Sequence, residues 1–207
     1  MIRLLFICGS PRKAATDYAM SVAEEAATSE GDVEVTRLNL SEMKFSPCRG
    51  CNACVRSNSL RCRIYDDDFQ DWNERFYTYD GILIGTAVYE MNITPQLCAF
   101  FSRFRSEYLN AKKDPFARMY LPGAALAVGG TRNGGQESAI RAIHSFYYTE
   151  GMPVVDGGMG AYGGACVWSQ DKMAKGAEED KVGLECVRTI AIRLARTAKV
   201  LKAGRRK

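Results

Sequence analysis

The sequence predicts an α/β fold in which one parallel five-stranded sheet is doubly wound, with helices on both faces. Short runs of aliphatic and β-branched residues alternate with stretches of helical periodicity along the chain. The 207 residues are 46% hydrophobic and 25% charged, as in an ordinary globular domain. No internal repeat or low-complexity linker divides the chain. We therefore expect a single domain over residues 1–207.

The first part of the chain is expected to supply two strands and two helices. Residues 2–8 (IRLLFIC) form an apolar, β-rich run, and residues 33–39 (VEVTRLN) alternate like a half-buried strand. Between them, residues 17–28 place three alanines and a valine on one helical face. Residues 66–77 also have a helical pattern, and their three opening aspartates suit the positive end of a helix.

The middle of the chain repeats this alternation. Residues 81–87 (GILIGTA) and 123–129 (GAALAVG) are the third and fourth apolar runs, and each precedes a helical stretch. The first of these helices is expected at 95–110, with Pro95 near its start, and the second at 135–149.

The last part of the chain completes the sheet and adds a long helix. Residues 152–155 (MPVV) are expected to form a short fifth strand, and the glycine-rich stretch 156–165 is expected to be a loop within the domain. Residues 178–202 have an apolar face that includes Val187 and Ile190, and they predict the final helix.

Three loops follow predicted strands, and they direct attention to one end of the sheet. Ligands of doubly wound sheets bind outside the carboxyl ends of the strands, at the topological switch point. The loops at that end are 9–16, 86–94 and 129–136. We therefore expect the ligand site among these three segments.

The first loop (GSPRKAAT) is suited to a phosphate group. Gly9 and Ser10 permit a tight turn with exposed backbone N–H groups, Arg12 and Lys13 add positive charge, and Thr16 adds a hydroxyl. The loop matches neither the dinucleotide fingerprint nor the P-loop. An ordinary turn between a strand and a helix is the alternative.

The other two loops are suited to a flat ring. Thr86 could hydrogen-bond a polar ligand edge, and Tyr89 could offer an aromatic surface. The third loop contains four glycines that allow close approach of backbone to a ligand. A strand-end tyrosine packed on its neighbours and a flexible turn are the alternatives. Together the three loops predict a site for flavin mononucleotide (FMN).

The segment 44–65 is expected to be an insertion that binds an iron–sulfur cluster. Cys48, Cys51, Cys54 and Cys62 are spaced C-x2-C-x2-C-x7-C, and tight spacing of this kind lets one short loop surround a cubane [4Fe–4S] cluster. Zinc is an alternative, although its ligands usually come as two separate pairs, often with histidine. Redox thiols or disulfides are another, although disulfides need an oxidising compartment.

Composition excludes several other classes of function. The net charge of +4 is too weak to indicate nucleic-acid binding, and no apolar stretch is long enough to span a membrane. One histidine, His144, excludes multi-histidine metal sites and makes Ser-His-Asp hydrolysis improbable. Because eight cysteines occur without a recognisable secretion signal, we expect a cytoplasmic location.

These motifs, in this order, resemble the iron–sulfur flavoprotein branch of the NADPH-dependent FMN reductase-like family. The resemblance covers about residues 3–165 and rests on GSPRKxxT, the cysteine motif, DDDF, TAVYxxxITPQLCAFFSR and GGxxxGGQE. It implies a flavodoxin-like fold with one FMN and one [4Fe–4S] cluster per subunit. It also implies a homodimer or homotetramer in which the cluster of one subunit lies near the FMN of its neighbour.

The resemblance also assigns roles to individual residues. The phosphate contacts are expected from Ser10, Arg12, Lys13 and Thr16. The ring contacts are expected from Thr86, Val88, Tyr89, Met91 and Asn92. A third wall is expected from Gly129, Gly130, Gly134 and Gly135. The chain departs from the usual family pattern at Ala87, Cys98 and Ser102, where proline, lysine and aspartate are usual.

The function expected is that of an oxidoreductase that passes electrons between a donor, either ferredoxin or NAD(P)H, and an acceptor. FMN exchanges electrons in pairs or singly, whereas a cluster exchanges them one at a time, so the pair would switch between two-electron and one-electron steps. No catalytic side chain is required. The alternatives are an NAD(P)H-dependent FMN or quinone reductase with a structural zinc or thiol loop, and a non-catalytic redox sensor. The remaining cysteines, 8, 98, 166 and 186, are expected to be small buried hydrophobes.

Overall fold

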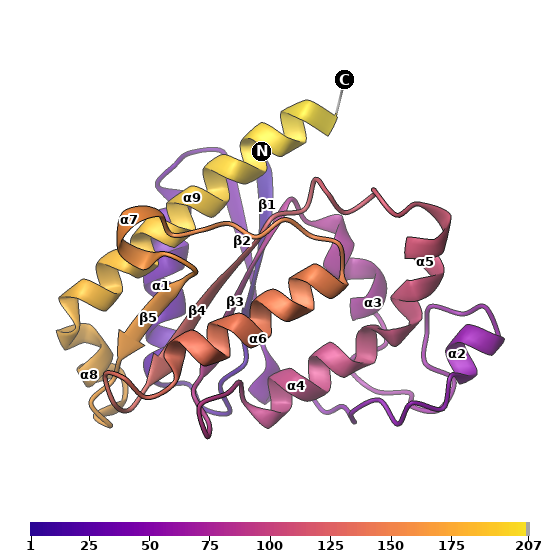
Figure 1. Cartoon of the computed structure of the whole chain (residues 1–207), viewed down its shortest axis with the longest axis horizontal. Helices are drawn as coiled ribbons and strands as arrows, with labels where there is room; N and C mark the ends of the chain where they lie inside the picture. The colour runs from indigo at the N-terminus through magenta and orange to yellow at the C-terminus, as the bar shows by residue number, and fades with distance from the viewer. Residues whose placement is uncertain (206–207) are drawn as a thin grey trace.

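The computed structural model describes residues 1–205, which form a five-stranded parallel sheet in the order β2-β1-β3-β4-β5 (Figure 1). Its strands are β1 (Ile2–Cys8), β2 (Val33–Asn39), β3 (Gly81–Ala87), β4 (Gly123–Gly129) and β5 (Ala165–Trp168). Neighbouring strands pair in register up to their carboxyl ends, with Cys8 opposite Gly85 and Gly129 opposite Trp168. The doubly wound parallel sheet predicted from the sequence is confirmed.

Helices cover both faces of the sheet (Figure 1). One face packs against α1 (Ala15–Thr28), α8 (Met173–Glu179) and α9 (Lys181–Arg205). The helical segments on the other side are α3 (Trp72–Arg75), η2 (Phe76–Thr78), α4 (Pro95–Ser102), η3 (Arg103–Glu107), α5 (Tyr108–Lys113) and α6 (Gln136–Thr149). Each face buries its own apolar cluster, so the sheet separates two cores and presents its strand ends to solvent.

The cysteine segment leaves the sheet after β2. η1 (Leu40–Glu42) precedes it, and it contains the short α2 (Ala53–Arg56), which Figure 1 shows at the edge of the molecule, away from the sheet. Arg105 of η3 donates to the side-chain oxygen of Asn52 at 3.1 Å, which joins this edge to the neighbouring helical layer.

The predicted position of the fifth strand is wrong. β5 is Ala165–Trp168, at the end of the segment expected to be a loop, which also contains α7 (Gly158–Ala161). Of residues 152–155, Val154 forms only an isolated bridge with Gly123, at the beginning of β4. Pro153 has no N–H to extend a ladder there, whereas Ala165–Trp168 pairs along Leu126–Gly129.

Three predicted helices are divided. Residues 66–77 contain only the short α3 and the beginning of η2, and 95–110 is split into α4, η3 and the start of α5. The tight turn of η3 buries Arg103 and Glu107, which both form ion pairs inside the protein. The expected helix 178–202 corresponds to the end of α8 and most of α9, with Asp180 between them. Within residues 1–205, no helix combines the length and the apolar character needed to cross a membrane.

Candidate functional site: a strand-end cavity and a cysteine loop

A cavity of about 310 Å³ lies at the carboxyl ends of the strands. It is lined by four segments that follow β1, β3, β4 and β5, of which the sequence had indicated the first three. The lining residues are Ser10, Arg12, Ala14, Ala15, Thr16, Ala87, Val88, Tyr89, Val128, Gly130, Ser169, Asp171 and Met173. The prediction that these loops meet at one edge of the sheet is therefore confirmed.

The phosphate loop places three of its four predicted residues on the cavity. The Ser10 hydroxyl donates to the carbonyl oxygen of Arg12 at 2.9 Å and accepts from its N–H at 3.3 Å, which closes a tight turn. Thr16 is buried in the first turn of α1, and the Arg12 side chain is exposed at the rim. Hydroxyl groups, a guanidinium and the N-terminus of α1 thus line the same cavity, and such groups bind anions.

Lys13 lies elsewhere. Its ammonium group forms an ion pair with Glu42 at 2.5 Å, and it does not line the cavity. The hydrogen bond to Glu42 raises the pKa of Lys13 above its ordinary value. The structure therefore gives Lys13 a partner at the end of η1 that the sequence pattern did not indicate.

The loop after β3 contains a tight turn from Tyr89 to Asn92. Backbone hydrogen bonds of 2.9 and 2.8 Å join these two residues in both directions. Glu90 and Met91 between them have φ values of 47° and 60°, a left-handed conformation that non-glycine residues seldom adopt. Val88 and Tyr89 line the cavity, and Tyr89 is 42% exposed. This strained, solvent-facing turn is the kind of backbone that concentrates at functional sites.

Thr86, which is buried, and Asn92, which is exposed, both hydrogen-bond the backbone of this loop. The buried Thr86 hydroxyl donates to the carbonyl oxygen of Ala87 at 2.8 Å and accepts from the Thr94 N–H at 3.3 Å. The Asn92 side chain accepts from the N–H of Ile93 at 2.8 Å. Neither residue lines the cavity, so both hold the loop in shape instead of facing the space that it encloses.

The glycines of the third loop divide into two pairs. Gly130 lines the strand-end cavity, and Gly135 lines an adjoining cavity of about 590 Å³ together with Met91 and Trp168. Gly129 and Gly134 serve close packing, because an added Cβ would lie 2.5 Å from the Gln136 amide nitrogen and 2.3 Å from the Thr131 hydroxyl, respectively. An added Cβ would also be crowded at the other two, 2.1 Å from an Asp171 carboxylate oxygen at Gly130 and 2.5 Å from the Met91 Cα at Gly135, so all four positions require glycine.

The segment after β5 supplies site residues that the sequence analysis missed. Ser169, Asp171 and Met173 line the cavity together with the phosphate loop. Asp171 and Met173 have positive φ values of 54° and 58°, so this wall is strained as well. It was missed because the fifth strand was placed too early.

Thr94 is another missed residue. It is fully buried, its hydroxyl donates to the carbonyl oxygen of Gly9 at 2.5 Å, and it accepts from the Leu97 N–H as the N-cap of α4. The signal was present, because a threonine directly before a proline is a typical start of a helix. Thr94 ties the end of β1 to the beginning of α4.

The four predicted cluster ligands lie on one loop. Cys48, Cys51, Cys54 and Cys62 are all free and partly exposed. Their sulfurs do not converge, and within residues 1–205 no three cysteine, histidine or acidic side chains are close enough together to hold a metal ion. Two backbone N–H groups already point at sulfur, that of Gly50 toward Cys48 at 3.4 Å and that of Tyr65 toward Cys62 at 3.5 Å. Four free thiols and N–H···S bonds form a donor set that fits an iron–sulfur cluster.

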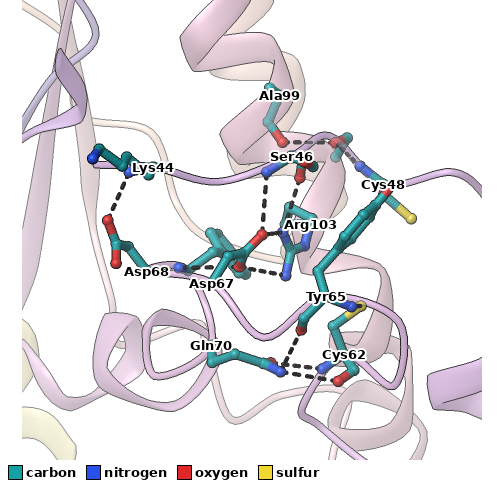
Figure 2. A network of polar contacts seen from close by, with 12 residues as sticks. Lys44, Ser46, Cys48, Cys62, Tyr65, Asp67, Asp68, Gln70, Ala99 and Arg103 are labelled. Atoms are coloured by element: carbon teal, nitrogen blue, oxygen red, sulfur yellow. Dashed lines mark hydrogen bonds and ion pairs between the residues drawn. The ribbon is translucent and has the colours of Figure 1, made fainter. Parts of the chain in front are cut away.

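Side chains from outside the loop fix both of its ends (Figure 2). The Cys48 N–H donates to the Ser102 hydroxyl at 2.9 Å. The Cys62 N–H donates to the Gln70 side-chain oxygen at 2.8 Å, and the amide of Gln70 donates back to the carbonyl oxygens of Cys62 and Tyr65. The first and last cysteines are therefore held in place at their backbones.

Arg103 joins the two flanks of the loop (Figure 2). Its guanidinium donates to both carboxylate oxygens of Asp67, at 2.6 and 3.0 Å, and to the carbonyl oxygen of Ser46 at 2.8 Å. Burial alone would raise the pKa of Asp67, but the hydrogen bonds and charge of Arg103 lower it below the ordinary value. This ion pair therefore contributes at neutral pH.

A second buried network lies away from the strand ends. Arg118 donates to Glu107 at 2.5 Å and to Glu150 at 2.7 Å, beside a cavity of about 540 Å³. Burial raises the pKa of Glu107 to about 7. No predicted site residue lines this cavity, so it is separate from the candidate site.

The remaining cysteines differ in exposure. Cys8 is buried and its pKa is raised by burial, and burial likewise raises the pKa of the partly buried Cys166 to about 11. The prediction that all four are buried is confirmed for Cys8 alone, because Cys166 and Cys186 are only partly buried, and it is wrong for Cys98, which is exposed. Cys98 lies on the solvent side of α4, whose other side packs against the sheet.

Comparison with known proteins decides the family. Residues 2–165 match the NADPH-dependent FMN reductase family. The chain is 38% identical to an iron–sulfur flavoprotein of Methanocaldococcus jannaschii, over 99% of both chains. The chain belongs to the iron–sulfur flavoprotein branch of this family. It is also 34% identical to an iron–sulfur flavoprotein of Methanosarcina thermophila over the full length of both.

The fold comparison agrees with this assignment. A solved structure of RosB, with a bound formylriboflavin phosphate intermediate, superposes with a TM-score of 0.74 at 13% identity, covering 98% of this chain and 81% of RosB. At that identity the likeness concerns the fold alone. Family membership identifies the chain as an oxidoreductase of the redox flavoprotein type.

Proposed function

We propose that this protein binds one FMN at the strand ends and one [4Fe–4S] cluster on the cysteine loop, and that it transfers electrons between a donor and an acceptor. The observation that carries the proposal is the occurrence, in one chain, of an anion-ready strand-end cavity and a loop with four free thiols. Bound together, the two groups would supply an exchange between two-electron and one-electron steps.

The phosphate of FMN would lie at the start of α1. Ser10, Arg12 and Thr16 line the cavity there, and the first N–H groups of α1 add their partial positive charge. Val88, Tyr89 and Gly130 would contact the rest of the ligand, with Met91 and Gly135 on the adjoining cavity. Thr86, Asn92, Gly129 and Gly134 would keep the loops in shape, and Lys13 would act only after leaving Glu42.

The cluster would be held by Cys48, Cys51, Cys54 and Cys62. The N–H groups of Gly50 and Tyr65 donate toward two of these sulfurs, and such bonds stabilise the negative charge of thiolate ligands and tune a cluster's potential. The chain needs no acid or base of its own for electron transfer, so we assign no catalytic residue.

The electron donor is proposed to be ferredoxin or NAD(P)H. Anaerobic reduction should be followed by absorption with ferredoxin, NADH and NADPH tried separately. Flavin bands, a broad shoulder at about 400 nm and about four irons per chain are expected. Flavin bands with one zinc per chain would favour the rival NAD(P)H-dependent flavin reductase. Stable reduction without turnover of any acceptor would favour a redox sensor.

The working unit is proposed to be a homodimer or homotetramer. The four cluster thiols are partly exposed, and a cluster held there would need cover from solvent and oxygen that a second copy of the chain could give. Sedimentation combined with rapid-mixing kinetics over a concentration series tests this. Dilution to monomers should slow electron transfer from flavin to cluster. A stable monomer with undiminished transfer would contradict the proposal.

A further inference from the structure

Arg103 is almost entirely buried at the point where the helical layer meets the cysteine loop. Its side chain is 2% exposed, and it makes three hydrogen bonds, two to Asp67 and one to the carbonyl oxygen of Ser46. It also stacks over Tyr65 and Phe69, with its guanidinium carbon 5.4 and 4.8 Å from the ring centroids. All these partners belong to the cysteine segment or its flanks.

The partners lie on opposite sides of the ligand cysteines in the sequence. Ser46 precedes Cys48, whereas Tyr65 and Asp67 follow Cys62. Asp67 also accepts from the Ser46 N–H at 3.1 Å, so the two flanks meet at Arg103 (Figure 2). A planar guanidinium can hold a carboxylate and a carbonyl together in a way that the single ammonium of lysine cannot.

Helix α4 connects Arg103 to the strand ends. Arg103 follows directly after α4, whose N-cap Thr94 is bonded to Gly9 and Thr86 beside the strand-end cavity. An eight-residue helix is about 12 Å long. α4 thus connects the scaffold of the cavity at one end with Ser102 and Arg103, which hold the cysteine loop, at the other.

We propose that Arg103 is the positioning residue of the cluster site, which closes the base of the cysteine loop and fixes it to the end of α4. This inference rests on the proposed function for the identity of the ligand, but not for the anchoring itself. The Arg103–Asp67 pair holds the two flanks of the loop together, at Ser46 and Asp67, before any cluster is bound. Cys51 and Cys54 lie between these flanks, where Arg105 holds the side chain of Asn52 and Ser106 holds the carbonyl oxygen of Leu60.

The first test is hydrogen exchange of the full-length chain, measured by mass spectrometry without cofactors. Arg103→Met and Asp67→Asn should each speed amide exchange in residues 44–70 by at least about tenfold, because local opening no longer breaks the ion pair. Arg103→Lys should restore protection only in part. Exchange in β1 and β3 should not change in any of these variants.

Arg118→Met is the matched control. Arg118 is also a buried arginine that holds carboxylates, but its partners are Glu107 and Glu150. The Arg118→Met variant should speed amide exchange near Glu107 and Glu150 and leave the exchange of residues 44–70 unchanged. Unchanged exchange of 44–70 in Arg103→Met, or an equal change in Arg118→Met, would overturn the proposal.

The second test is anaerobic reconstitution with iron and sulfide. Arg103→Met should take up cluster at least about fivefold more slowly than the parent protein, while its FMN affinity stays within about twofold. Equal uptake rates would contradict a positioning role even if exchange changed. If the parent protein itself took up no iron and sulfide, the proposed function would fail, and the exchange result alone would decide whether Arg103 anchors the loop.

Discussion

The strand-end cavity is formed by backbone that hydrogen bonds hold in place, whereas the cysteine loop is attached to the rest of the protein by a few side-chain contacts along its length. Around the cavity, hydrogen bonds within the loops close the turn at Ser10 and the turn from Tyr89 to Asn92. The Thr94 hydroxyl bonds the carbonyl oxygen of Gly9, directly after β1. In the loop, Cys48 and Cys62 are fixed through Ser102 and Gln70. The cysteine sulfurs remain apart.

This difference indicates two modes of cofactor binding. A site made of strand ends is largely formed before its ligand arrives. A site made of thiols on a loop must bring its ligands together, so cluster binding and local folding are the same event. We therefore expect the cluster to be the more easily lost of the two groups.

The largest effect is expected from removing a cluster ligand. Changing Cys48, Cys51, Cys54 or Cys62 to alanine should abolish or degrade the cluster, because three thiolates cannot complete the coordination of four irons. FMN content should remain that of the parent protein. Iron, sulfide and flavin analysis measures both. Full iron and sulfide in all four variants would refute the assignment.

A large and selective effect is expected at the phosphate loop. A charge-assisted hydrogen bond contributes roughly 1.5–3 kcal/mol, so Arg12→Ala should weaken FMN binding by about 10- to 100-fold. Riboflavin, which lacks the phosphate, should bind almost as before. Lys13→Ala is the matched control and should have the smaller effect, because Lys13 is paired with Glu42. Fluorescence titration gives these affinities, and equal losses for FMN and riboflavin would rule out this placement of the phosphate.

A moderate effect on stability is expected at Thr94. Thr94→Val removes the cap of α4 and the hydrogen bond to Gly9, so the free energy of unfolding should fall by about 1–2 kcal/mol. Because α4 joins both regions, FMN affinity and cluster retention should both decline. Denaturant unfolding measures the first effect, and cofactor analysis the second. Thr94→Ser, which keeps the hydroxyl, is the control, and a loss confined to one cofactor would show that α4 does not couple the regions.

The smallest effect is expected from pH at Glu107, which lies outside the strand-end cavity. Burial raises its pKa to about 7 in the folded protein, so the folded state binds a proton that the unfolded chain releases near pH 4.5. The stability that this proton contributes is complete below about pH 4.5 and is lost as pH rises through about 7. Glu107→Gln should flatten this part of the dependence of unfolding free energy on pH. An unchanged slope between pH 5 and 8 would show that Glu107 is ionised in the folded protein.

Most of the sheet could be predicted because its strands are short apolar runs whose limits coincide with turns. The first four strands were predicted at the positions that the structure gives them. β5 could not, because Ala165–Trp168 is only four residues long and follows glycines, and its strand character comes from pairing with β4. Because β5 was misplaced, the cavity wall at Asp171 was not predicted either.

The candidate site was likewise predictable only in part. Motif spacing was enough to place the phosphate loop and the four cysteines on the chain. It could not show that Lys13 pairs with Glu42, or that Arg103 closes the cysteine loop on Asp67, because these partners are far apart in the sequence and meet only in the fold. Short-range patterns identify ligand-binding residues, whereas the residues that position them depend on tertiary contacts.

Native mass spectrometry of anaerobically purified protein tests the central claim most directly, because it weighs both cofactors on the same molecule. The account predicts a particle that carries, for each chain, the mass of one FMN and of one cluster of four irons and four sulfides. Mild oxidation should remove the cluster mass first and leave the FMN mass in place. A particle with FMN and a single zinc per chain, or with neither cofactor after anaerobic reconstitution, would contradict it.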